Sequence, residues 1–299
     1  MTTRYTIIVA IAFALTVSIA CKPKRSTPPP APEITADAVI QEDSVPSVDV
    51  KKTTVWPRKV GEIVPPDGFT RGNSSGFGSY LRSLPLKPEG STVYLYDGTE
   101  KYWQGGAYAV IDTEIGNVDL QQCADAVIRL RAEYLWGQKR YSDIHFNFTN
   151  GFNAEYSKWA EGYHISINGN HASWYKATEP DYSYKNFRKY LYKVFSFAGT
   201  ASLSRELISV PISRARIGDV FILGGHPGHA MIIVDMAEDG KGHKAILVAQ
   251  SYMPAQDIHV VTNLRDESNS PWYIFDESVE SFRFPEWSFD ASQLKRFRD

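Results

Sequence analysis

Cysteine is scarce in this sequence, with only Cys21 and Cys123 among its 299 residues. If Cys21 carries a lipid, as its position indicates below, Cys123 has no partner within the chain, and a disulfide framework is excluded. The chain also has no large net charge, because its 32 lysines and arginines nearly balance its 34 acidic residues and leave a net charge of −2. This balance gives no electrostatic reason to expect nucleic acid as a partner.

Several motifs that would define an enzyme class are also missing. There is no internal repeat, and the glycine-rich segment 72–78 lacks the lysine of a nucleotide-binding loop. No pattern sets two carboxylates at the separation that glycoside hydrolysis needs. His226 and His229 are separated by a Pro-Gly pair, which denies them the helical spacing of metal ligands. The sequence therefore predicts neither a metal site nor a cofactor.

The chain opens with an apolar run over residues 5–20, preceded by Arg4 and closed by small residues. The run is short for a membrane span and has the three regions of a signal peptide. Residues 18–21, Ser-Ile-Ala-Cys, resemble a lipobox, in which a diacylglycerol is attached to the cysteine before cleavage. We therefore expect a signal peptide over residues 1–20. The alternative is a plain secretory signal with an incidental cysteine.

A proline-rich stretch follows, so we expect residues 21–56 to form a lipidated, disordered stalk and residues 57–299 to form one globular domain. The stalk composition cannot bury enough apolar area to offset its chain entropy. The expected location is the cell envelope, with the lipid on Cys21 holding the protein to the outer membrane, on its periplasmic or its surface face. The membrane is thus the first expected partner.

Periodicity in the domain predicts helices first and antiparallel strands later, which is typical of an α+β fold. The strongest helix pattern spans residues 120–136, with Asp119 as its N-cap. A second helix candidate covers residues 187–207. The predicted strands cover residues 93–96, 107–111, 220–223, 229–234, 245–249 and 258–261.

An aromatic-rich segment, residues 138–200, lies between the helix and the later strands. Its rings could form the floor of a glycan or peptide groove, or a local core of their own. The residues concerned are Tyr141, Phe146, Phe148, Trp159, Tyr163, Trp174 and Tyr175.

Three side chains form the candidate catalytic set. Cys123 lies near the start of the predicted helix, where backbone N–H groups and the helix dipole favour a thiolate. His229 begins a strand directly after a glycine-rich loop, and Gln250 ends the next strand. A cysteine, a histidine and a polar residue that orients the imidazole are the parts of a cysteine hydrolase. The other interpretation of Cys123 is a small buried hydrophobe.

The order of these parts resembles that of the NlpC-type papain-like cysteine peptidases and amidases. Gly218-Asp219 precedes a strand as it does in that family, and the family histidine falls at His229. The resemblance implies a helix packed on an antiparallel sheet, with residues 138–200 as an insertion. It also implies Cys123 as nucleophile, His229 as base and Gln250 as the third member, acting without a cofactor on amides of peptidoglycan or a related envelope polymer.

The chain also resembles, over most of residues 60–285, a group of bacterial lipoproteins catalogued as domain of unknown function 4846. The segments that carry this resemblance are residues 120–126, 227–230 and 249–260. It implies no activity. Two other interpretations therefore stand beside the hydrolase, namely an envelope protein that binds glycan or peptide without catalysis, and a structural lipoprotein whose partner is another envelope protein.

Overall fold

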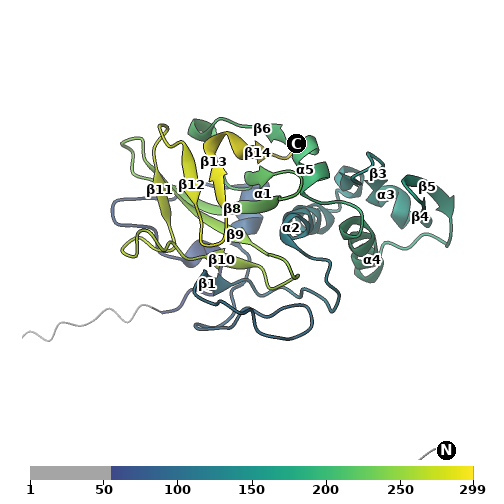
Figure 1. The fold of residues 1–299 in the computed structure, drawn as a ribbon, viewed down its shortest axis with the longest axis horizontal. Coiled ribbons are helices and arrows are strands. Elements are labelled where there is room, and N and C mark those ends of the chain that lie inside the picture. Colours follow the sequence, from purple (N-terminus) through teal and green to yellow (C-terminus); the bar gives the residue numbers. More distant parts are fainter. Residues whose placement is uncertain (1–54, 299) are drawn as a thin grey trace, which may run out of the picture. The chain divides into compact units, whose positions relative to one another are not determined.

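A computed structural model describes residues 55–298 of the chain, all of them within the compact unit Thr53–Asp299 (Figure 1). The expected signal peptide, Cys21 and the stalk up to residue 54 lie outside the described residues. Among residues 55–298, no helix has the length and apolar character needed to cross a membrane.

The fold is α+β and is built on one antiparallel sheet of eight strands. The order along the sheet is β1-β10-β9-β8-β7-β14-β6, and β11 pairs with β9 outside this path. The strands are β1 (Ala107–Val110), β6 (Ile208–Ser209), β7 (Val220–Leu223), β8 (His229–Glu238), β9 (Lys244–Gln250), β10 (His259–Val261), β11 (Tyr273–Phe275) and β14 (Leu294–Arg296).

Both faces of the central strands are covered, which explains why β8 and β9 are apolar over nearly their whole length. Ala230 and Ile232 belong to the core shared with helices α1 (Gly76–Arg82) and α2 (Cys123–Gly137). Met231 belongs to a second core, on the side of the hairpin formed by β12 (Ser281–Arg283) and β13 (Ser288–Asp290). The alternation along β8 is that of a strand between two layers. Figure 1 shows α2 and the hairpin beside the sheet.

Helix α2 begins at Cys123, with Gln122 as its N-cap, and not after Asp119 as the sequence predicts. The carboxylate of Asp119 instead accepts hydrogen bonds from the backbone N–H of Ala255 at 2.7 Å and from the side chain of Gln122 at 3.0 Å. Asp119 therefore fixes the loop after β9 rather than the helix. This places Cys123 at the first position of the helix.

The segment between α2 and β6 contains two small hairpins and three helices. The elements are β2 (His145–Asn147), β3 (Asn153–Glu155), α3 (Tyr156–Ala160), β4 (Tyr163–Asn168), β5 (His171–Lys176), α4 (Tyr184–Phe195) and α5 (Thr200–Glu206). The single helix predicted over residues 187–207 is thus two helices, because the chain leaves helical geometry before Gly199, the N-cap of α5. Residues 93–96, predicted as a strand, make only isolated bridges, Tyr94 with Glu100 and Leu95 with Gln256. Short 3-10 turns lie at Val60–Glu62, Tyr141–Asp143, Ile212–Arg214 and Ala291–Gln293.

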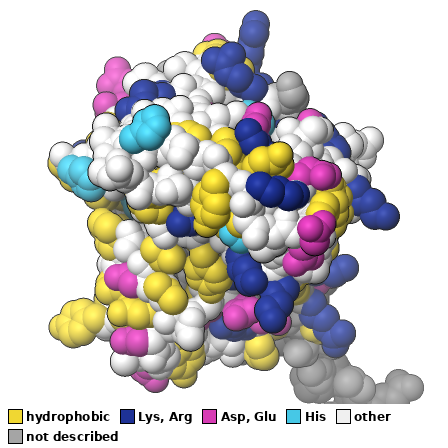
Figure 2. Space-filling model, turned by 90° about the vertical axis from the view of Figure 1, so that its right-hand side faces the viewer, with side chains coloured by type: hydrophobic (Ala, Val, Ile, Leu, Met, Phe, Trp, Pro, Cys, Tyr) yellow, Lys and Arg dark blue, Asp and Glu magenta, His cyan; other side chains and the backbone are white. Residues whose placement is uncertain are grey.

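Most aromatic side chains of this segment belong to the core on the α2 side of the sheet. Phe146, Phe148 and Trp159 are buried there, so these rings extend the main core and do not form a separate core of their own. Tyr163 and Tyr175 remain exposed on the β4–β5 hairpin. Figure 2, which views the molecule from this end, shows hydrophobic side chains lying among charged ones.

Candidate cysteine–histidine site

The thiol of Cys123 lies where the N-terminus of α2 meets the start of β8. The backbone N–H groups of Cys123, Ala124 and Ala230 are close enough to the thiol to lower its pKa. Within residues 55–298, however, the thiol forms no hydrogen bond with the His229 ring, whose hydrogen-bond partner is Gln250. Ala230 directly follows His229, so the sulfur lies against the backbone next to the imidazole-bearing residue. The first N–H groups of a helix have no partner within the helix, which leaves them available to an oxyanion or a thiolate.

His229 and Gln250 are brought together by strand pairing. His229 begins β8 and Gln250 ends β9, and because these strands are antiparallel neighbours, the two positions share one end of the sheet. His229 Nε2 lies 2.8 Å from Gln250 Oε1. Both side chains are buried, with 2% of each residue exposed.

The amide of Gln250 is held in one orientation by two further partners. Its Nε2 donates to Glu286 Oε2 at 2.6 Å and lies 3.3 Å from His259 Nε2. His259 Nδ1 lies 3.0 Å from the carbonyl oxygen of Asp257, to which it donates, so its Nε2 is the accepting nitrogen. The opposite orientation of the amide would set two oxygens, one of them charged, against each other. Gln250 therefore presents Oε1 to His229.

This orientation selects the tautomer of His229. An amide oxygen accepts but does not donate, so His229 Nε2 must carry the proton. In the neutral ring, Nδ1 then has the free lone pair. A histidine in this tautomer can accept a proton through Nδ1 while Gln250 holds the ring in place.

Aromatic rings and one ion pair close the site. The ring of His229 lies 4.9 Å from that of Tyr252 and 5.1 Å from that of Trp287, measured between centroids. Glu286 pairs with Lys101, whose ammonium also lies 5.6 Å from the centre of the Tyr252 ring. These groups keep water away from the hydrogen bond between His229 and Gln250.

Burial has a larger effect on the pKa values of Cys123 and His229 than the helix terminus has. Burial raises the pKa of the Cys123 thiol to about 11, and the three backbone N–H groups only oppose that rise. Burial also lowers the pKa of His229 to about 4, against the raising effect of its hydrogen bond to Gln250. The lowered thiol pKa expected from the helix N-terminus is therefore wrong for this state. At neutral pH the site holds a thiol and a neutral imidazole.

We therefore expect the alkylation rate of Cys123 by iodoacetamide to rise mainly above pH 9, because only the thiolate reacts and burial raises its pKa to about 11. Mass spectrometry of the peptide that contains Cys123 measures the rate at each pH. Denatured protein is the control, since an unperturbed thiol titrates at about 8.5. Rapid labelling of the folded protein at pH 6 would contradict the expectation.

The structure also adds residues that sequence reasoning missed. Glu286 and Trp287 lie between β12 and β13, and Glu286 is 36 positions from its partner Gln250. The alternating pattern around His259 does not single out this residue as functional. It is nevertheless fully buried, and its Nε2 lies against the amide nitrogen of Gln250. The sequence signal available for it was a histidine inside an otherwise apolar run that pairs with β9.

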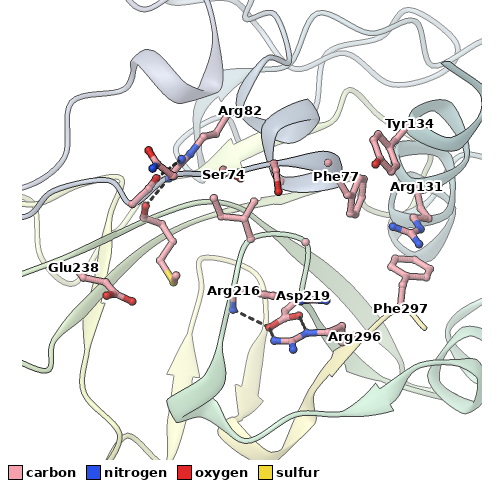
Figure 3. Close-up of a pocket in the computed structure, with 18 of the residues that line it drawn as sticks. Ser74, Phe77, Arg82, Arg131, Tyr134, Arg216, Asp219, Glu238, Arg296 and Phe297 are labelled. Atoms are coloured by element: carbon pink, nitrogen blue, oxygen red, sulfur yellow. Dashed lines mark hydrogen bonds and ion pairs between the residues drawn. The ribbon is translucent and has the colours of Figure 1, made fainter. Parts of the chain in front are cut away.

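A second feature lies apart from these residues. Four cavities of about 360 to 580 Å³ within residues 55–298 are lined by neither Cys123 nor His229. One of them, of about 580 Å³ and shown in Figure 3, lies near the other end of β8, where Met236 and Glu238 line it.

The fold and the site define an α+β protein with antiparallel sheets, in which a helix that begins with a cysteine packs on the longest strand. A family model described as "Domain of unknown function (4846)" matches residues 61–296, and the chain belongs to this family. The resemblance seen in the sequence to that family is thereby confirmed. Neither the curated proteins nor the solved structures contain a match to the chain.

Proposed function

We propose that this protein is a papain-like, NlpC-type cysteine hydrolase that cleaves amide bonds in cell-wall peptide or a related envelope polymer. The observation that carries the proposal is the hydrogen bond between His229 Nε2 and Gln250 Oε1, from which the tautomer of His229 follows. Gln250 accepts the Nε2 proton at 2.8 Å, so Nδ1 is the basic nitrogen, and the thiol of Cys123 lies against the next residue of the same strand.

The chemistry follows from these positions. Cys123 Sγ forms a bond to the carbonyl carbon while its proton passes to His229 Nδ1. The carbonyl oxygen becomes an oxyanion, which the backbone N–H of Cys123 stabilises. The C–N bond then breaks as His229 returns the proton to the departing amine, and a thioester remains. Water hydrolyses the thioester with His229 again accepting a proton, which restores the thiol.

The neutral pair suits this order of events. With the pKa of Cys123 at about 11 and that of His229 at about 4, the proton stays on sulfur until attack. His229 thus acts as a general base in the manner of a serine hydrolase rather than as one half of a preformed ion pair. The ring contact with Trp287 supports the same role, because it shields the hydrogen bond that orients the imidazole.

The deciding experiment incubates purified peptidoglycan with the protein and counts newly formed amino groups by mass spectrometry of the released peptides. We expect release by the wild type and none by Cys123→Ala. The matched control is Ser251→Ala, which alters a buried neighbour of Gln250 that bonds only to the backbone. Equal release by the wild type and Cys123→Ala would refute the hydrolase.

A second candidate is an envelope protein that binds glycan or peptide without cleaving it. Two observations favour it, the burial of Cys123, of which 6% is exposed, and the exposed rings of Tyr163 and Tyr175. Lys158 and Lys176 lie 5.5 and 5.2 Å from the centre of the Tyr163 ring, which presents a mixed cationic and aromatic surface. Co-sedimentation with peptidoglycan that Tyr163→Ala abolishes, without any release of peptides, would establish this candidate.

Export and attachment belong to the same proposal. The lipid on Cys21 would hold the protein to the outer membrane and bring it within reach of the envelope polymer. We expect the wild type to partition with membranes, and Cys21→Ala to be released into the soluble fraction. Fractionation and immunoblotting measure the difference.

A further inference from the structure

Lys101 lies next to the residues that orient His229, and only 8% of it is exposed. Its ammonium pairs with Glu286 Oε1. The loop that carries Lys101 is closed at Val93, whose carbonyl oxygen accepts the N–H of Lys101 at 2.9 Å. The Gln104 side chain also bonds the backbone N–H and O of Val93, at 2.9 and 3.1 Å. The ammonium is therefore held toward Glu286 by a fixed stretch of backbone.

The two oxygens of Glu286 have different partners. Oε1 pairs with Lys101, and Oε2 accepts a hydrogen bond from Gln250 Nε2 at 2.6 Å. Gln250 Oε1 in turn lies 2.8 Å from His229 Nε2. Because the side chains of Lys101 and Glu286 are only 8% and 15% exposed, water competes little for these contacts. Four side chains thus connect the ammonium to the imidazole, although Lys101 and Glu286 are 185 positions apart.

The ion pair fixes the direction of the hydrogen bonds that follow it. A carboxylate only accepts hydrogen bonds, so Gln250 must turn its Nε2 toward Glu286 and its Oε1 toward His229. A largely buried carboxylate needs a compensating cation, and Lys101 supplies it. The pair need not stabilise the fold for this purpose, because loss of hydration offsets much of the attraction between buried charges. What the pair supplies is a fixed acceptor beside Gln250.

We infer that Lys101 is a positioning residue: acting through Glu286 and Gln250, it keeps the lone pair of the neutral imidazole on Nδ1. Its effect on catalysis rests on the proposed function, in which Nδ1 of His229 accepts the proton of Cys123. The tautomer of the ring does not itself depend on catalysis. It can therefore be measured without any substrate.

Replacing Glu286 with glutamine should reverse the tautomer of His229. The new amide has one oxygen, which the ammonium of Lys101 takes because an ammonium can only donate. The amide nitrogen at position 286 then faces Gln250 Nε2, two donors oppose each other, and the Gln250 amide turns over. His259 Nε2 opposes this turn, but its contact is neutral and 3.3 Å long, whereas the contact of Lys101 is charged and stronger. Gln250 Nε2 then donates to His229 Nε2, and the ring proton lies on Nδ1.

Long-range ¹H–¹⁵N correlation NMR at neutral pH measures the outcome, because protonated and unprotonated ring nitrogens have separate ¹⁵N shifts. Burial lowers the pKa of His229 to about 4, so the ring is neutral under these conditions. We expect the shifts of Nδ1 and Nε2 to exchange between the wild type and Glu286→Gln, and His229→Gln assigns the signals by their loss. Asp239→Asn is the control. It removes a carboxylate paired with a different histidine, His243, and should leave the shifts of His229 unchanged.

The double variant Lys101→Met/Glu286→Gln isolates the role of Lys101. Without the ammonium, the amide at position 286 is free to turn its oxygen toward Gln250, so the wild-type tautomer of His229 should return. A purely structural Lys101 would produce no such restoration. A wild-type ring proton on Nδ1, an unchanged tautomer in Glu286→Gln, or no restoration in the double variant would each overturn the inference. Cys123→Ala should keep the wild-type shifts, so failure of the hydrolase leaves this test intact.

Discussion

Replacing Asp235 with alanine is expected to lower the free energy of unfolding by about 3–5 kcal/mol, the cost of breaking a buried ion pair by removing one partner. The Asp235 side chain is fully buried on β8, and its carboxylate forms ion pairs with Arg71 at 2.7 Å and with Arg82 at 2.6 Å. Its Oδ1 also accepts the backbone N–H of Met236 at 2.8 Å. Alanine would leave two largely buried cations without their counter-ion.

The position of Asp235 in the strand explains why this one residue contributes so much to the free energy of unfolding. The pairing of β8 with β9 shifts register between Ile233 and Asp235, which interrupts the alternation of an otherwise apolar strand. Through Arg71 and Arg82, the carboxylate ties the segment that precedes the sheet to its longest strand. Chemical denaturation measures the loss, and Glu277→Ala is the control, since it removes an exposed carboxylate. A change below about 0.5 kcal/mol, typical of surface substitutions, would contradict the expectation.

Much of the central sheet could be predicted from the sequence. The runs that form β7, β8 and β9 are apolar and separated by glycine-containing turns. Such a pattern predicts strands from local sequence, without knowledge of the tertiary contacts. The same runs place His229 at a strand start and Gln250 at a strand end. Antiparallel pairing of β8 with β9 then brings the two positions to the same end of the sheet.

The start of α2 could not be read from local signals because a tertiary contact uses the apparent cap. Asp119 is a good N-cap by residue type, but its carboxylate accepts from Ala255, 136 positions away. The prediction of a lowered pKa for Cys123 was wrong for a related reason. Sequence reveals the helix terminus beside the thiol but not the layers that bury it, and burial is the larger effect.

The role of Glu286 could not be predicted from the residues around it in the sequence. It lies in the turn between two short strands, where an acidic residue is unremarkable, yet it decides which atom of Gln250 faces His229. Only the packing of the β12–β13 hairpin beside β7 and β8 brings it there. The residues that orient a site are therefore harder to predict than the residues that react, because their role lies in a hydrogen-bond partner from another part of the chain.

Under the proposed hydrolase mechanism, replacing His229 with alanine is expected to slow amide hydrolysis by about 10²–10⁴-fold, the usual contribution of a general base. Gln250→Ala should cause a smaller loss, since the base remains but its tautomer and ring orientation are no longer selected. The matched control is His243→Ala, which removes an exposed histidine paired with Asp239. The measured quantity is kcat/KM for a peptide amide released from the envelope polymer.

The pH profile separates this role from a structural one. His229 acts as a base only when Nδ1 is unprotonated, and burial lowers its pKa to about 4, so wild-type kcat/KM should stay level at neutral pH and fall only as the pH drops through about 4. Loss of the hydrogen bond to Gln250 removes an effect that raises this pKa, so the acid limb of Gln250→Ala should move to lower pH. A purely structural Gln250 would change the amount of folded protein and leave the limb in place. Full activity of His229→Ala would exclude the general base altogether, and with it the order of bond making and breaking proposed for Cys123.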